Sequence, residues 1–277
     1  MRVAMDVVQH YRRAGTDKRG AVAYSFCTLV TNLPQYQAMV EGFLRLGFTS
    51  ADCEFLYIDN SGSNQADAFS GCNAFLRRAS GRYVVLCHQD VMVLEDGREK
   101  LDKLLAALSE KDSIWAVCGN AGIDAHGRRF IRITDPFMPD QAIGKPFPRQ
   151  VMSLDENFIV VKSEANLALS RDLTGFHWYG SDLCLIADIL GWTAYVIDFH
   201  LRHDSRGRVD QHYNSLRSRL RAKYTRAFRP RTLRVLTERN VYLSGNHWAS
   251  AGVNAAIDVA ISLYAQFKRT VLARRGK

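Results

Sequence analysis

Short apolar runs alternate with segments of helical spacing along the first half of the chain. β-branched and aromatic runs bounded by turn residues predict core strands at residues 21–30, 54–58, 83–87, 115–118 and 194–199. Between the first three strands, apolar side chains recur at helical spacing over 35–46 and 67–78, and again after the acidic pair at 95 and 96. This alternation predicts right-handed βαβ units. The expected fold is therefore α/β, with a mainly parallel central sheet flanked by helices.

The middle of the chain follows a different pattern. Residues 134–150 hold four of the six prolines, and this predicts a long loop. A further apolar run, FIVV, follows at 158–161. Helical spacing then returns, with Ser181 as the expected N-cap and Gly191 as the expected stop. Asp182 would lie in the first turn of this helix.

Positive charge is concentrated at the C-terminal end. Residues 1–200 hold 20 Lys and Arg against 24 Asp and Glu, whereas residues 201–277 hold 17 against 4. From about residue 210 the pattern predicts helices, one arginine-rich and one over 252–272. We therefore expect one α/β domain over 1–209 and a basic helical extension over 210–277. Such an extension could bind a phosphate, an anionic membrane surface or nucleic acid. An arginine-rich helical face that is only solvated, with no partner, is an equally expected explanation.

The composition is that of a globular protein. With 277 residues, 47% of them hydrophobic, the chain can bury a full core. We find no run of roughly 18 apolar residues, and the first twenty residues lack the apolar segment of a signal peptide, so we expect a cytoplasmic protein. The cysteines show no CxxC spacing, which favours free thiols buried in the core. They are Cys27, Cys53, Cys72, Cys87, Cys118 and Cys184.

Three predicted strands end on short polar side chains. These are Thr31 and Asn32 after the first strand, Asp59 and Asn60 after the second, and His88, Gln89 and Asp90 after the third. Ligands of open parallel sheets bind outside the carboxyl ends of the strands, so one edge of the sheet is the expected site.

The usual phosphate-binding loops are absent from this edge. There is no GxGxxG after the first strand and no GxxxxGK[ST] in the chain. A carboxylate at a strand tip, Asp90, suits a divalent cation that would neutralise a diphosphate. His200 and His203 flank the end of the last strand, and either could supply a second ligand, His203 being the better placed in the loop.

Several short motifs occur in a fixed order between residues 22 and 206. They are DNS at 59–61, Asn73, ASGRY at 79–83, HQDV at 88–91, LDENF at 154–158 continuing as FIVVKSE, GFHWYGSDLCL at 175–185, Gly191 and His203. As an ordered set they resemble family 2-type glycosyltransferases with a GT-A fold. More narrowly, they resemble the branch that carries HQD where other members carry Asp-x-Asp.

The resemblance implies an inverting transfer from a nucleoside diphosphate sugar. By this resemblance, Asp182 would be the catalytic base. Asp59 would lie near the nucleobase and ribose of the donor, and Asp90 and His203 would bind the metal on its diphosphate. The base takes the proton of the acceptor hydroxyl while the leaving diphosphate gains charge. The residues expected to contact substrate are Thr31, Asn32, Asp59, Asn60, Asn73, His88, Gln89, Asp155, Trp178 and Tyr179.

Two positions depart from the family pattern. His88 stands where other members have the first acid of Asp-x-Asp, which changes the ligand set expected for Mn²⁺ or Mg²⁺. Ser181 stands where an acid often precedes the base, so Asp182 is the one obvious carboxylate on this helix.

The leading hypothesis is a glycosyltransferase that uses a nucleoside diphosphate sugar, with UDP as the favoured nucleotide. Its acceptor would be a glycan or a lipid-linked sugar of a cell-surface polymer, and the basic extension would contact an anionic membrane. The alternative is a non-catalytic, transferase-like domain that binds a polyanion. Nucleic acid is disfavoured because the arginines are not interleaved with aromatics. A nucleotidylyltransferase is disfavoured because TNLPQYQ is not a glycine- and arginine-rich loop.

Overall fold

The structure is a computed structural model that describes residues 20–136, 138–205, 210–234, 236 and 240–275. Residues 1–19, on which the cytoplasmic prediction partly rests, lie outside this range. The chain divides into two compact units, residues 1–216 and 217–277. The predicted boundary at 209 and 210 stays a prediction.

A seven-stranded sheet forms the centre of the first unit, in the order β2-β1-β3-β11-β5-β12-β9. Its strands are β1 (Val22–Val30), β2 (Cys53–Asp59), β3 (Gly81–Cys87), β5 (Trp115–Gly119), β9 (Arg149–Val151), β11 (Phe158–Lys162) and β12 (Thr193–Val196). Strands β2, β1 and β3 are parallel, as are β5 and β12, whereas β11 runs antiparallel between β3 and β5. The predicted mainly parallel α/β sheet is therefore confirmed, with the FIVV run as its antiparallel central strand.

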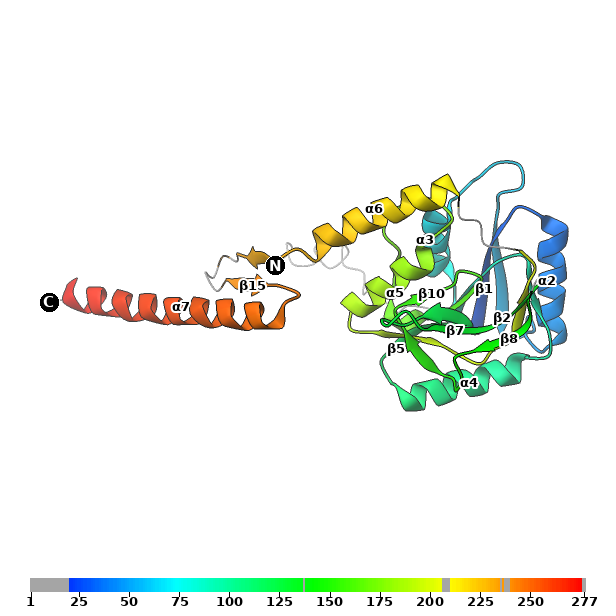
Figure 1. Cartoon of the computed structure of the whole chain (residues 1–277), viewed down its shortest axis with the longest axis horizontal. Helices are drawn as coiled ribbons and strands as arrows, with labels where there is room; N and C mark the ends of the chain where they lie inside the picture. Colours follow the sequence, from blue (N-terminus) through cyan, green and yellow to red (C-terminus); the bar gives the residue numbers. More distant parts are fainter. Residues whose placement is uncertain (1–19, 137, 206–209, 235, 237–239, 276–277) are drawn as a thin grey trace, which may run out of the picture. The chain divides into compact units, whose positions relative to one another are not determined.

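Helices cover both faces of this sheet (Figure 1). They are α2 (Leu33–Arg45), α3 (Ala68–Arg78), α4 (Arg98–Lys111) and α5 (Tyr179–Ile189), with a 3-10 turn η2 (Ser163–Ala165) after β11. Apolar side chains of α2 and α4 join one core cluster with side chains of β1, β3 and β5. Helices α3 and α5 lie on the face opposite α4. The helix predicted over 67–78 begins at Ala68, because the Asp67 side chain accepts the Ser70 amide as an N-cap.

A second, smaller sheet stands beside the ends of the central strands. Its order is β10-β6-β7-β13-β4, with β8 paired to β7. The strands are β4 (Val91–Val93), β6 (Ala121–Ile123), β7 (Arg129–Asp135), β8 (Met138–Ile143), β10 (Ser153–Leu154) and β13 (Leu201–His203). The prediction of a long loop over 134–150 is corrected by β8 of this sheet, which lies within that segment, and by β9 of the central sheet, which begins in it. The prolines made these strands difficult to predict from the sequence. Proline usually indicates a loop, but an edge strand tolerates it where the backbone needs no ladder hydrogen bond.

The start of α5 also differs from the prediction. Ser181 is not the N-cap, because the helix begins at Tyr179 and its cap position is Trp178. Trp178 has φ of 62°, in the left-handed region that bulky side chains rarely adopt. The Ser181 hydroxyl instead lies 2.7 Å from the hydroxyl of Ser153. Asp182 does lie in the first turn, as expected.

The C-terminal unit contains a hairpin as well as helices. Helix α6 (Gln211–Ala227) spans the division between the units, and α7 (His247–Arg275) contains the predicted helix over 252–272. Between them, β14 (Arg231–Leu233) pairs with β15 (Val241–Leu243), a short hairpin that the sequence pattern did not indicate. Among the described residues, no helix combines the length and the apolar composition that crossing a membrane requires.

All six cysteines are free and buried, as the sequence predicts. Burial raises the pKa of Cys53, Cys72 and Cys184 to about 12. These thiols stay protonated at physiological pH and contribute packing volume rather than nucleophiles.

Neighbouring residues on α2 allow a test of the core. Phe43 is fully buried and its ring centroid lies 4.5 Å from that of Phe26, whereas Leu44 is 39% exposed. We expect Phe43→Ala to lower the free energy of unfolding by about 3–5 kcal/mol, because it removes buried surface and leaves a cavity. Leu44→Ala should cost about 1 kcal/mol or less. Urea denaturation of both variants would measure this, and equal losses would contradict the assignment of the core face.

Candidate active site at the carboxyl ends of the strands

Gln89 joins the ends of two parallel strands. Its side-chain oxygen accepts the backbone amides of Thr31 and Asn32 at 2.8 and 2.9 Å, and its amide nitrogen donates to the Thr31 hydroxyl at 2.9 Å. Asn32 also caps α2 by accepting the Gln35 amide at 3.2 Å. The sequence places these side chains at one edge, and the structure shows that they bond to one another there.

The polar residues after β2 differ in their exposure. Asp59 is exposed, and bonds from the Ser61 hydroxyl and amide lower the pKa of its carboxyl. Asn60 is buried, donating to the Ala66 carbonyl and accepting the amides of Gln65 and Ala66. Asn60 therefore shapes its own loop, while Asp59 faces solvent.

Asn73 clamps a segment far along the chain. Its side chain donates to the Leu169 carbonyl at 3.1 Å and accepts the Leu169 amide at 2.8 Å. Two complementary bonds to one backbone position hold α3 against that segment. The expected substrate contact of Asn73 stays a prediction, and the structure gives this side chain a scaffolding role.

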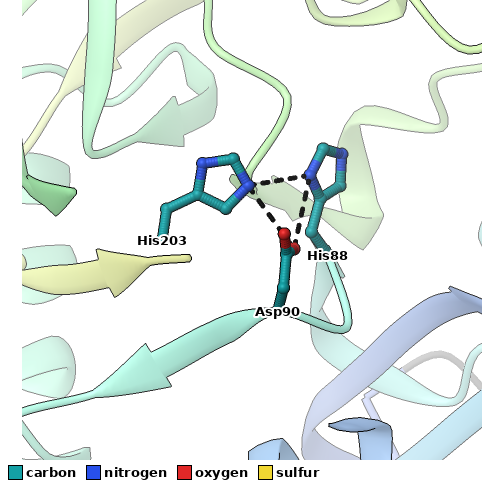
Figure 2. A group of neighbouring side chains, drawn as sticks. All are labelled: His88, Asp90 and His203. Atoms are coloured by element: carbon teal, nitrogen blue, oxygen red, sulfur yellow. Dashed lines mark hydrogen bonds and ion pairs between the residues drawn. The ribbon is translucent and has the colours of Figure 1, made fainter. Parts of the chain in front are cut away.

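His88, Asp90 and His203 form a compact cluster (Figure 2). Nε2 of His203 lies 3.4 Å from Oδ1 of Asp90 and 3.3 Å from Nδ1 of His88. Nδ1 of His88 lies 4.0 Å from the same Asp90 oxygen. One ligand atom from each residue falls within 4.8 Å of the others, a spacing that a single cation could bridge.

Strand pairing brings this cluster together. His88 and Asp90 lie in the turn between β3 and β4, and β4 pairs antiparallel with β13 so that Val91 faces His203. The amide of Asp204 donates to the Asp90 carbonyl at 3.1 Å, extending the pairing into the turn. His200, the alternative ligand in the sequence, lies elsewhere, with Nε2 2.9 Å from the Thr134 hydroxyl.

A hydrogen-bond chain fixes the tautomer of His88. The Tyr179 hydroxyl donates its one proton to the Glu156 carbonyl at 2.9 Å, and Nε2 of His88 lies 3.0 Å from that hydroxyl. Because the hydroxyl proton is already used, Nε2 of His88 must be the donor. Nδ1 then carries a lone pair directed at Asp90 and His203, which is how the second ring nitrogen orients a metal-binding histidine.

The charges in the cluster divide between the two histidines. Partial burial, and then the positive charge of a protonated His203, lower the pKa of His88. The His88 side chain is 38% exposed. Burial opposes charge on His203, but the hydrogen bond and the negative charge of Asp90 outweigh it and raise the pKa of His203. Burial also opposes the charge of Asp90, and the bonds from His203 and Ser205 outweigh it, so the Asp90 pKa falls well below its usual range.

A cavity of about 230 Å³ borders the cluster. Its polar wall comes from residues at the carboxyl ends of β1 and β3 and from the start of α5. These polar residues are Thr31, Asn60, His88, Gln89, Asp90 and Tyr179. Its apolar wall includes Leu29, Phe75 and Phe176. The sequence-predicted edge is therefore a real concave site.

The remaining predicted residues lie at different depths around this site. Asp155 is exposed and holds Asn157 through two bonds to Oδ1, and its charge favours protonation of both cluster histidines. Tyr179 is buried behind His88, whereas Trp178 is half-buried with its ring 4.9 Å from that of Tyr213.

Asp182 is fully enclosed. It is 0% exposed, and its two oxygens accept the Ser170 amide at 2.8 Å and the Ser170 hydroxyl at 2.6 Å. A buried carboxylate with these donors ties α5 to the segment before it. Its role as a base stays a prediction, and this geometry directs it into the protein interior.

Sequence reasoning did not single out Glu156, Tyr213 or Ser205. Ser205 lies 3.2 Å from Nε2 of His203, and Glu156 accepts the Gly180 amide at 3.3 Å. The one sequence signal for Glu156 was its place beside Asp155 in LDENF.

The central sheet is mainly parallel, with β11 and β9 antiparallel to their neighbours and helices on both faces, and this is the mixed α/β architecture that the sequence predicts. A protein from Fuscovulum blasticum named "ATP synthase subunits region ORF 6" is 39% identical over 234 residues, covering 82% of this chain and 93% of that protein. The chain belongs to the family of that protein, whose name states no activity. No family model matches the chain.

Two solved structures show a distant likeness. A mannosyltransferase from Pyrobaculum calidifontis, in complex with GDP-Man and Mn²⁺, has a TM-score of 0.48 and 12% identity over 80% of this chain and 70% of that chain. TarS from S. aureus, in complex with UDP-GlcNAc, has a TM-score of 0.46 and 12% identity over 70% of this chain and 61% of that chain. Likeness at this level says nothing of the substrate of this chain.

The bonds of Gln89 can be tested by amide exchange. Gln89→Met removes the single oxygen that accepts the Thr31 and Asn32 amides, so each amide should exchange roughly fivefold faster at about 1 kcal/mol per lost bond. Gln89→Glu keeps acceptor oxygens and should preserve most of the protection. Hydrogen exchange followed by NMR would measure this, with amides inside α2 as the reference, and unchanged protection in Gln89→Met would contradict the role of Gln89.

Proposed function

We propose that the chain is a glycosyltransferase that transfers a sugar, with inversion, from a nucleoside diphosphate sugar to a hydroxyl of a glycan or lipid-linked acceptor. The observation that carries this proposal is the His88, Asp90 and His203 cluster on the rim of a cavity at the carboxyl ends of parallel strands. Ligands of open parallel sheets bind at that edge. The polar and apolar walls of the cavity suit a nucleotide, which has charged and stacking parts.

The donor set of the cluster fits a divalent cation. Two imidazole nitrogens and one carboxylate oxygen converge, and the neutral His88 already presents a lone pair at Nδ1. Such mixed nitrogen and oxygen ligands favour Mn²⁺ over Mg²⁺, which prefers oxygen alone. When bound, the cation would neutralise charge that develops on the diphosphate leaving group.

The chain's own residues would then orient the donor. Gln89 holds the Thr31–Asn32 turn in place, so the edge of the cavity is set before a ligand arrives. Asp59 is the exposed acceptor at the end of β2, where it could take hydrogen bonds from ribose hydroxyls. UDP is the nucleotide expected from the family resemblance, and GDP is the comparison that a binding screen should include.

The two histidines near the last strand provide a matched test. We expect wild-type protein to bind Mn²⁺ more tightly than Mg²⁺, and His203→Ala to weaken Mn²⁺ binding at least tenfold because it removes a ligand. His200→Ala should leave binding near the wild-type value, because that ring bonds Thr134 outside the cluster. Electron paramagnetic resonance of free Mn²⁺ would measure the affinities.

The same variants would report on the nucleotide. Thermal shifts with UDP-sugars and GDP-sugars, each with and without Mn²⁺, should show a metal-dependent stabilisation by one donor class that His203→Ala loses. The proposed site would be contradicted if the two histidine variants bound Mn²⁺ equally well. It would also be contradicted if the donor sugars raised the melting temperature equally with and without Mn²⁺.

The basic C-terminal unit supports a peripheral membrane contact for this transferase. Arg217 and Arg221 on α6 are exposed, and α7 exposes large apolar side chains, among them Trp248 at 84% and Phe267 at 66%. Basic and apolar side chains together suit the surface of an anionic bilayer. This contact would bring the protein to lipid-linked acceptors at the cytoplasmic face.

Vesicle binding tests the contact. Each arginine near an anionic surface contributes about 1 kcal/mol, so Arg217→Glu with Arg221→Glu should weaken binding to phosphatidylserine vesicles roughly 30-fold or more. Arg77→Glu with Arg78→Glu, an exposed pair on α3, is the matched control and should bind normally. Co-sedimentation at low and high salt would measure this, since salt screens such contacts. If the protein bound vesicles but turned over no donor, the non-catalytic alternative would replace the proposed function.

A further inference from the structure

A second cleft lies beside the start of α5. Its volume is about 380 Å³, and it lies between the second sheet, the LDENF segment and the start of α5. Its polar and aromatic lining includes Arg129, Asp155, Glu156, Trp178, Ser181 and Tyr213. A hydrogen bond links this cleft to the cavity at the strand ends: Tyr179, which lines that cavity, donates its hydroxyl proton to the backbone carbonyl of Glu156, which lines the cleft.

The cleft has the character of a sugar-binding surface. The rings of Trp178 and Tyr213 lie 4.9 Å apart, and Nε1 of Trp178 donates to the Tyr213 carbonyl at 3.3 Å. Trp178 also holds its left-handed backbone conformation here, a strain that persists only where the surroundings enforce it. Aromatic faces beside carboxylates are a surface on which a pyranose can stack and donate hydrogen bonds.

Asp182 cannot serve this cleft in its observed conformation. It is not among the residues that line either cavity, and both of its oxygens accept bonds from Ser170. A base must lie within hydrogen-bond reach of the proton that it takes. Moving the Asp182 carboxylate to the cleft would break two buried bonds.

Glu156 is the carboxylate that the cleft offers instead. It is half-buried, and Oε1 accepts the Gly180 amide at 3.3 Å at the start of α5. Its backbone carbonyl accepts the Tyr179 hydroxyl, which in turn contacts Nε2 of His88. The backbone of Glu156 is therefore linked through Tyr179 to His88 of the cluster, and Glu156 also lines the second cleft.

We propose that Glu156 takes the proton of the acceptor hydroxyl, and that the Trp178–Tyr213 cleft binds the acceptor sugar. This rests on the proposed function. The acceptor oxygen would form a bond to the anomeric carbon while the bond from that carbon to the diphosphate oxygen breaks. The electron pair of the broken bond leaves with the diphosphate, and the acceptor proton moves to the Glu156 carboxylate.

The environment of Glu156 suits a proton acceptor. Burial, and then the charge of Asp155, raise the pKa of Glu156 to about 8, against the effect of the backbone amides at the start of α5. A carboxylate with a raised pKa binds a proton more strongly than an ordinary one, which favours proton transfer from an alcohol. The titratable or charged groups facing it are Asp155, Tyr179, Cys72, Cys184 and Arg129.

Turnover of the full-length protein with Mn²⁺ provides the test. Release of UDP or GDP would be followed for UDP-glucose, UDP-galactose, UDP-N-acetylglucosamine and GDP-mannose, with water or octyl glycosides as acceptors. We expect Glu156→Gln to lower kcat about 100-fold or more, with the donor KM and the melting temperature near wild type. Glu156→Asp should recover part of the rate.

The pH profile separates a base from a merely structural carboxylate. Wild-type kcat should rise with pH as Glu156 deprotonates, with a midpoint at or below about 8, because a bound cation nearby favours the ionised form. Glu156→Gln should lose that rise. Asp182→Asn should lower the melting temperature, since it alters the bonds to Ser170, while the folded fraction keeps kcat within about tenfold of wild type.

Three results would overturn the assignment. Normal kcat in Glu156→Gln would remove Glu156 as the base. Folded Asp182→Asn without turnover, beside an active Glu156→Gln, would return the role to Asp182. No nucleotide release by wild-type protein with any donor and acceptor would overturn the proposed function itself, and the assignment of Glu156 with it.

Discussion

The pairing of β13 with β4 is the constraint on which the site depends. It sets Leu201 opposite Val93 and His203 opposite Val91, and so joins segments more than a hundred residues apart in sequence. A slip of one residue in this register would turn the His203 side chain to the other face of the sheet. Asp90 would then lose the partner whose hydrogen bond keeps its carboxyl ionised. Leu201 and Val91 are fully buried, so the register is held by the core and not by the polar cluster.

The hydrogen-bond partners of the polar side chains around the site decide which atom of each one is left for a ligand. The bond from Nε2 of His88 to Tyr179 leaves Nδ1 for the cluster. Gln89 uses its side-chain oxygen on two backbone amides and so shapes the strand ends. Asp182 is matched by Ser170 on both oxygens and is left with an architectural role. Burial and the charge of the neighbouring Asp155 raise the pKa of Glu156, so this carboxylate binds a proton more strongly.

Much of this arrangement follows from sequence pattern. The strands ending at 30, 59 and 87 and the helices between them were predictable, because apolar periodicity and turn residues are local signals. The prediction failed at 134–150, where β8 and β9 lie among prolines, and at the hairpin of β14 and β15. Short edge strands depend on their partners in the sheet, and no local pattern reports those partners. The start of α5 was missed for a similar reason, since Trp178 adopts a conformation that only its surroundings can enforce.

The sequence by itself determined the α/β class, the buried thiols and the edge of the sheet at which polar residues gather. These follow from hydrophobic periodicity and from the rule that parallel strands end together. Only the tertiary structure decided which carboxylates face a cavity. Asp182 and Glu156 both precede or begin apolar elements in the sequence, yet packing encloses one against Ser170 and turns the other to the cleft beside Trp178. Exposure depends on contacts between distant segments, and that is information which spacing along the chain does not contain.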